Sequence, residues 1–181
     1  YASLLGLPVP FAAVHLLFIN LLTDSLPAIA LGLEPHTDEV MGEKPRPRNE
    51  GILTKPFLFS VGIEGLVIAA ATITAFYLGL SYGGAAAGQT MAFSTLCLSR
   101  LFHGFSCKSQ RPVLLTRKFW NNRALLGAFA AGSLLLGLVL LVPALEPLFS
   151  VAPLPVGMIG AVVGLAFSSM LTIQLLKLFR R

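Results

Sequence analysis

Charged residues are scarce in this chain. Asp, Glu, Lys and Arg make up 12% of its 181 residues, whereas 55% are hydrophobic. A soluble domain carries about a quarter charged residues. No Gly-x-x-x-x-Gly-Lys-Ser/Thr loop is present, and the longest polar segment, 34–55, is too short to form a nucleotide-binding domain. The composition therefore argues against a soluble nucleotide-binding protein and favours a single membrane domain.

Cysteine is equally rare. The chain has two, Cys97 and Cys107, and ten residues of one helix would separate them by about 15 Å. That distance is too long for a disulfide, so we expect free thiols. The histidines, at positions 15, 36 and 103, do not have the spacing of a zinc site. A disulfide-stabilised scaffold and a zinc-binding module are thus both disfavoured.

Long apolar stretches dominate what is present. Five of them are long enough to cross a bilayer as helices, so we predict an all-α, polytopic membrane bundle formed by the whole chain, 1–181, as one domain. The expected transmembrane helices cover residues 10–33, 56–80, 88–106, 122–144 and 153–177. The third is the weakest of the five, because Arg100 and His103 lie inside it.

Basic residues are concentrated in every second connection between the predicted helices. They lie in segment 34–55, in and beside 107–121 and at the C-terminus, whereas the turns 81–87 and 145–152 contain none. Lys and Arg favour the cytoplasmic side, so the first helix is predicted to run inward. The net charge of +5 then follows from topology and from contact with anionic membrane lipid. No nucleic-acid partner is needed to explain it.

A polar cluster interrupts the first apolar stretch. Asn20, Thr23 and Asp24 are spaced i, i+3 and i+4, which places them on one helical face. Pro27 follows; it lacks an N–H and clashes with the carbonyl four residues back, so the helix should loosen just past the cluster. An intramembrane carboxylate is costly without a function or a partner. Oxygen ligands and one negative charge favour a hard cation; the alternative is a polar kink that holds helices together.

This cluster also carries a resemblance to a known family. The run Pro10-Phe-Ala-Ala-Val-His-Leu-Leu-Phe-Ile-Asn20-Leu-Leu-Thr23-Asp24-Ser25-Leu-Pro27-Ala28 resembles the sixth membrane helix of the P-type cation-transporting ATPases, closest to the calcium-pump-like branch. The following segment is similar to the loop between helices six and seven of those pumps, through Glu34-Pro35, Met41, Pro45-Arg-Pro-Arg48, Glu50 and Leu53.

The resemblance implies that the chain is helices six to ten of such a pump, in a bacterial plasma membrane. Asn20, Thr23 and Asp24 would supply oxygens to one site for the transported ion, Ca²⁺. The remaining N-terminal part of the pump would be the partner. That part would supply further ligands from helices four and five, and it would use Mg²⁺ and ATP. Loop 34–55 would contact its phosphorylation domain.

The chain alone cannot hydrolyse ATP, because it contains no Asp-Lys-Thr-Gly-Thr phosphorylation sequence. Two alternatives remain open. The ion could be sodium, magnesium, manganese or a proton, since these oxygen ligands do not define it. The chain could also be a free-standing, non-enzymatic membrane protein.

Arg100 lies near the position where the eighth helix of calcium pumps can supply a ligand to a second calcium site. A guanidinium cannot ligate a cation, so Arg100 either replaces the second ion with a built-in positive charge or extends toward the membrane interface. Glu64 is expected at a similar depth on the preceding helix. Because paired charges are tolerated in lipid, we predict that Glu64 contacts Arg100, directly or through a water molecule. The alternative is that Glu64 sits apart from Arg100 and faces lipid or the interface.

Overall fold

The computed structural model describes residues 2–35, 51, 53–109, 112, 116 and 119–179, and there the chain consists of helices joined by turns and irregular segments, with no strand. Helices α1 (Ala13–Phe18), η2 (Ile19–Asp24) and α2 (Ser25–Gly32) follow one another without a break, after a short η1 (Ser3–Leu5). The long helices are α3 (Lys55–Cys107), α4 (Arg123–Leu141) and α6 (Val156–Phe179), with η5 (Pro143–Leu145) and α5 (Glu146–Phe149) between the last two.

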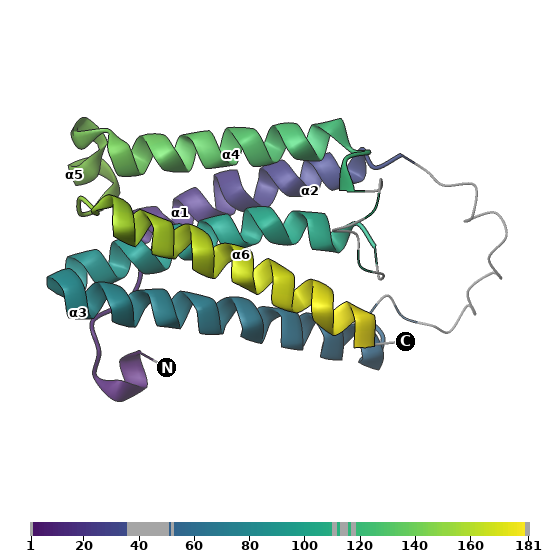
Figure 1. Ribbon diagram of the computed structural model, residues 1–181, viewed down its shortest axis with the longest axis horizontal. Coiled ribbons are helices and arrows are strands. Elements are labelled where there is room, and N and C mark those ends of the chain that lie inside the picture. The colour runs from purple at the N-terminus through teal and green to yellow at the C-terminus, as the bar shows by residue number, and fades with distance from the viewer. Residues whose placement is uncertain are drawn as a thin grey trace, which may run out of the picture.

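Within these described residues, four helical segments are long and apolar enough to cross a membrane: Ala13–Gly32, Lys55–Cys107, Arg123–Leu141 and Val156–Phe179. They lie side by side in one bundle (Figure 1). The predicted all-α membrane bundle is therefore confirmed. Most of segment 34–55 and part of segment 107–121 fall outside the described residues, as do His36 and the last two residues.

Helix α3 is two helices that meet at a sharp reversal. Gly83 and Gly84 interrupt its helical geometry, with φ/ψ of −140°/21° and 71°/−156°. Gly84 has the positive φ that glycine adopts without a steric penalty. The chain folds back there (Figure 1), so α3 has a first arm before Gly83 and a second arm after Gly84. These arms cover the predicted ranges 56–80 and 88–106 and extend beyond them, so that the break is limited to Gly83 and Gly84 where a turn over 81–87 had been predicted.

Prolines shift the ends of the last two helices relative to the prediction. Helix α4 ends at Leu141, and Pro143 opens η5, where 122–144 had been expected to be helical. Helix α6 begins at Val156, directly after Pro155. The short helix α5 lies in what was predicted to be a turn. Proline favours helix starts and interrupts helix interiors, which accounts for these shifts.

The second arm of α3 forms the centre of the bundle. Phe93, Leu101 and Phe105 are almost completely buried, and they pack against α1, α4 and α6. The connection between α4 and α6 is fastened to this core by two polar contacts. His15 Nε2 donates to the Phe149 carbonyl (2.7 Å), and the Ala152 N–H donates to the Thr90 hydroxyl (2.8 Å). This end of the bundle is thereby held together by side chains from α1 and α3.

Candidate cation site

The polar cluster forms the wide helical turn η2. Ile19–Asp24 is π-helical, between two α-helical segments. The Thr23 hydroxyl donates to the Ile19 carbonyl (2.8 Å), and the Ser25 hydroxyl donates to the Asn20 carbonyl (2.9 Å). The Thr23 and Ser25 hydroxyls thus add hydrogen bonds to backbone carbonyls of this widened turn.

Pro27 accounts for the position of this turn. It is the third residue of α2, within the first turn, where backbone N–H groups have no partner inside the helix. A regular helix would require Pro27 to donate to the Thr23 carbonyl, which it cannot do. We had expected the helix to loosen just past the cluster. The structure instead widens the helix over the cluster itself and restarts α2 before Pro27.

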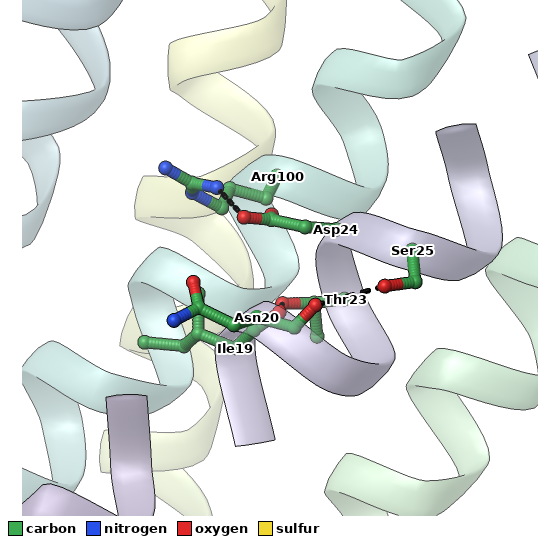
Figure 2. A network of polar contacts seen from close by, with 6 residues as sticks. All are labelled: Ile19, Asn20, Thr23, Asp24, Ser25 and Arg100. Carbon is green, nitrogen blue, oxygen red and sulfur yellow. Dashed lines mark hydrogen bonds and ion pairs between the residues drawn. The ribbon is translucent and has the colours of Figure 1, made fainter. Parts of the chain in front are cut away.

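Asn20 and Asp24 share one side of this turn. Asn20 is exposed in the described bundle, and the Asp24 side chain is 35% exposed. Figure 2 shows the Asn20 amide and the Asp24 carboxylate projecting to the same side, with Ser25 on the other. Thr23, by contrast, is 1% exposed and lies beside the buried Cys97 thiol. Two oxygen-bearing side chains therefore face outward from the bundle, while the third is buried within it.

Arg100 forms an ion pair with Asp24. Its Nη1 contacts Asp24 Oδ2, and the Arg100 side chain is 41% exposed (Figure 2). The pair joins the second arm of α3 to the wide turn. A guanidinium beside a lone intramembrane carboxylate neutralises it, which lowers the cost of holding both in lipid. The sequence identified both residues but not that they would contact each other.

Among the described residues, Glu64 and Arg100 do not form a direct ion pair. Glu64 Oε2 lies 3.6 Å from His103 Nε2, and Arg100 is engaged by Asp24. Both Arg100 and His103 are on the second arm of α3, and His103 is the one that lies 3.6 Å from Glu64. His103 was missed as the partner of Glu64. The available signal was its position three residues after Arg100, at a depth where a carboxylate on the neighbouring helix could reach it.

A cavity of about 420 Å³ opens beside the ion pair. Its polar lining comes from Thr23, Asp24, Arg100 and His103, and the rest is mostly apolar side chains of α2 and α3. Among the described residues, no group of three or more His, Cys, Asp or Glu side chains is arranged to hold a metal ion. The described residues therefore present one carboxylate, an amide and a hydroxyl, which is a partial ligand set for a hard cation.

Comparisons with known proteins agree with this description. The family model for the C-terminus of cation-transporting ATPases matches residues 8–179. The chain is 36% identical to a calcium-transporting ATPase of Bacillus subtilis over 173 residues, and 35% identical to one of Listeria monocytogenes over 170 residues. It is 30% identical over 183 residues to mouse calcium-transporting ATPase type 2C member 2.

These alignments cover 92%, 93% and 99% of the chain respectively, but only 19% of each relative. The chain thus spans about a fifth of the length of the curated relatives it matches.

Proposed function

This chain belongs to the cation-transporting ATPase family, as the C-terminal region of a calcium-pump-like P-type ATPase, and from that premise we propose that it supplies part of an intramembrane Ca²⁺ site. Asn20, Thr23 and Asp24 would contribute oxygens, and Asp24 would carry the charge. The rest of the pump would supply the remaining ligands and the ATP-dependent phosphorylation, with Mg²⁺.

One observation carries this proposal: Asp24 lies in a widened turn on a side of the bundle that the chain's own helices leave partly open. A carboxylate that served only to hold these helices together would be covered by them. Here Asn20 is exposed, and the partly exposed Asp24 lines a cavity. That placement fits a site completed by helices from another part of the same pump. It supports a partial site better than a polar kink.

Arg100 fits the role of a tethered positive charge. Its ion pair with Asp24 puts a permanent positive charge beside the proposed ligand, and by resemblance Arg100 would lie near the position where the eighth helix of calcium pumps can supply a ligand to a second ion. The contact supports this role over extension toward the interface. We propose accordingly that the pump binds one Ca²⁺ at Asp24, in a bacterial plasma membrane surrounded by lipid. The two bacterial relatives cited above support that location.

Two measurements test the proposal. An immunoblot of source membranes with an antibody to segment 34–55 should show a polypeptide several times larger than 19.2 kDa. A band near 19 kDa would instead support the free-standing membrane protein.

The purified full-length protein should then form a phosphoenzyme from ATP when Ca²⁺ is present. Phosphorylation that requires Mn²⁺ or Na⁺ and does not respond to Ca²⁺ would mean that the site binds that ion instead of calcium.

We expect Arg100→Gln in the full-length pump to lower the Ca²⁺ concentration for half-maximal phosphorylation by about tenfold. The substitution removes a positive charge that repels the incoming ion, and repulsion between unit charges a few ångströms apart amounts to a few kcal/mol near a protein surface. Arg100→Lys is the matched control, because it keeps the charge. If Arg100→Gln and Arg100→Lys titrated alike, the charge of Arg100 would have no influence on the site.

A further inference from the structure

Three side chains from separate segments meet at the end of the bundle predicted to be cytoplasmic. Asn122 Nδ2 donates to Glu34 Oε2 (2.7 Å), and Lys108 Nζ lies 3.2 Å from Glu34 Oε1. Asn122 is 2% exposed, and so is the side chain of Lys108. Figure 1 shows the start of α4 beside the end of α2. We call Glu34, Lys108 and Asn122 the terminal node.

Asn122 joins two helix ends with one amide group. Its Oδ1 accepts from the Leu125 N–H (2.8 Å), which caps the N-terminus of α4. Its Nδ2 also donates to the Ala30 carbonyl (2.8 Å), near the C-terminus of α2. Helix ends expose backbone groups that need such partners. Asn122 therefore has a capping function toward α4 and a separate tethering function toward α2.

The tether acts on the helix that carries the proposed ligands. Helix α2 has eight residues, Ser25–Gly32, so about 12 Å of rigid helix separates the node from Asp24. The wide turn η2 lies at the other end of α2. A short helix fixed at one end and joined to a π-helical turn at the other transmits a displacement of the node directly to Asp24. Glu34 also begins the connection to α3, and Lys108 and Asn122 border the connection to α4.

We infer that the terminal node positions the ion-binding helix, so that Glu34, Lys108 and Asn122 set the cation affinity of Asp24 without contacting the ion. This inference rests on the proposed function. The three residues are positioning residues, and their effect should be on the cation concentration needed for phosphorylation. Phosphorylation at saturating cation should remain, because none of them belongs to the ion site.

The Asn122→Asp variant separates tethering from capping. Aspartate caps a helix N-terminus as well as asparagine does, so the bond from Leu125 is kept. The donor to Glu34 and Ala30 is lost, and two carboxylates would then face each other, which is unfavourable. In the double variant Asn122→Asp/Glu34→Gln, the new amide at position 34 can donate to the aspartate, and the two carboxylates no longer face each other. The double variant thus restores a hydrogen bond between positions 122 and 34, with donor and acceptor exchanged.

The experiment is a Ca²⁺ titration of phosphorylation by ATP in the full-length pump. We expect Asn122→Asp to raise the half-saturating Ca²⁺ concentration about tenfold, the order expected for losing a hydrogen bond to a charged group. The double variant should recover the part of that change that comes from the contact with Glu34, whereas the bond to the Ala30 carbonyl stays lost. Asn121→Ala is the matched control, since Asn121 is an exposed neighbour. Thermal unfolding of each variant shows whether it remains folded.

Three outcomes would overturn the inference. Asn122→Asp could titrate like the wild type, or the double variant could fail to recover affinity. Asn122→Ala could also lower thermal stability while leaving the Ca²⁺ titration unchanged. That result would mean that Asn122 only caps α4 and does not affect the ion site. Each of these requires a wild-type pump that is phosphorylated in a Ca²⁺-dependent way. A wild type that lacks this response would overturn the proposed function itself, and the node's role with it.

Discussion

Asp24→Asn in the full-length pump is expected to abolish cation-dependent phosphorylation by ATP. The change keeps the size of the side chain and removes its charge. Attraction between a carboxylate and a cation about 4 Å apart is worth about 4 kcal/mol per unit charge near a protein surface, which corresponds to roughly a thousandfold in affinity. It also leaves Arg100 without its ion-pair partner, so the net charge beside the site becomes positive. Phosphorylation by ATP is measured over a range of Ca²⁺ concentrations.

A second variant separates two roles that would make Asp24 essential: neutralising Arg100 and binding the ion. If Asp24 only neutralises Arg100, then Asp24→Asn/Arg100→Gln has no unpaired charge and should regain phosphorylation. If Asp24 is the ligand, the double variant should remain inactive. Glu146→Gln is the control, because Glu146 lies in the first turn of α5 on the connection between α4 and α6. Wild-type phosphorylation in Asp24→Asn would remove Asp24 from the site.

The sequence predicted the helical bundle well because its signals are local. Apolar stretches of bilayer length identify membrane helices whatever they pack against. Gly83 and Gly84 likewise favour a turn between two helices without any knowledge of the rest of the chain. The ends of α4 and α6 moved by a few residues because Pro143 and Pro155 decide where a helix can continue. The short helix α5 has too few residues to produce a periodic signal.

The candidate site was only partly predictable, because its contacts are not local. Asn20, Thr23 and Asp24 were identified from their spacing and from Pro27. The partner of Arg100 depends on how the second arm of α3 is rotated about its axis. A rotation of this arm by a fraction of a turn changes whether Arg100 or His103, three residues further on, lies within reach of Glu64. In the structure Glu64 contacts His103 and Arg100 contacts Asp24. Hydropathy contains no information about that rotation.

The small-residue series Gly160, Gly164 and Ser168 illustrates the same limit. Such spacing favours close packing between membrane helices, within one chain or between two copies. All three residues are exposed in the described bundle, and a Cβ added at Gly160 or Gly164 would meet no atom within 4 Å. The glycines that do pack closely are at other positions. Gly79 and Gly88 lie at the contact between the two arms of α3.

Gly79→Ala is therefore expected to cause the largest loss of stability among the glycine substitutions. The new Cβ would lie 2.6 Å from the Ala87 carbonyl oxygen and 2.6 Å from the Gly88 Cα. Both are backbone atoms, so no rotamer change can relieve the clash and the two arms must separate. Overpacking of this kind costs about 3 kcal/mol, or roughly 10 °C in the midpoint of thermal unfolding, measured for the purified protein in detergent.

Gly62→Ala provides the matched control for this effect. Gly62 lies on the same arm, and an added Cβ there would meet nothing within 4 Å, so its unfolding midpoint should stay close to that of the wild type. Equal midpoints for the two variants would mean that the arms do not approach each other at Gly79. If the arms do separate in Gly79→Ala, the Glu64–His103 contact between them should weaken as well, because its two residues lie on opposite arms. The hairpin at Gly83 and Gly84 would then hold in register not only the helices but also the charges beside the proposed ion site.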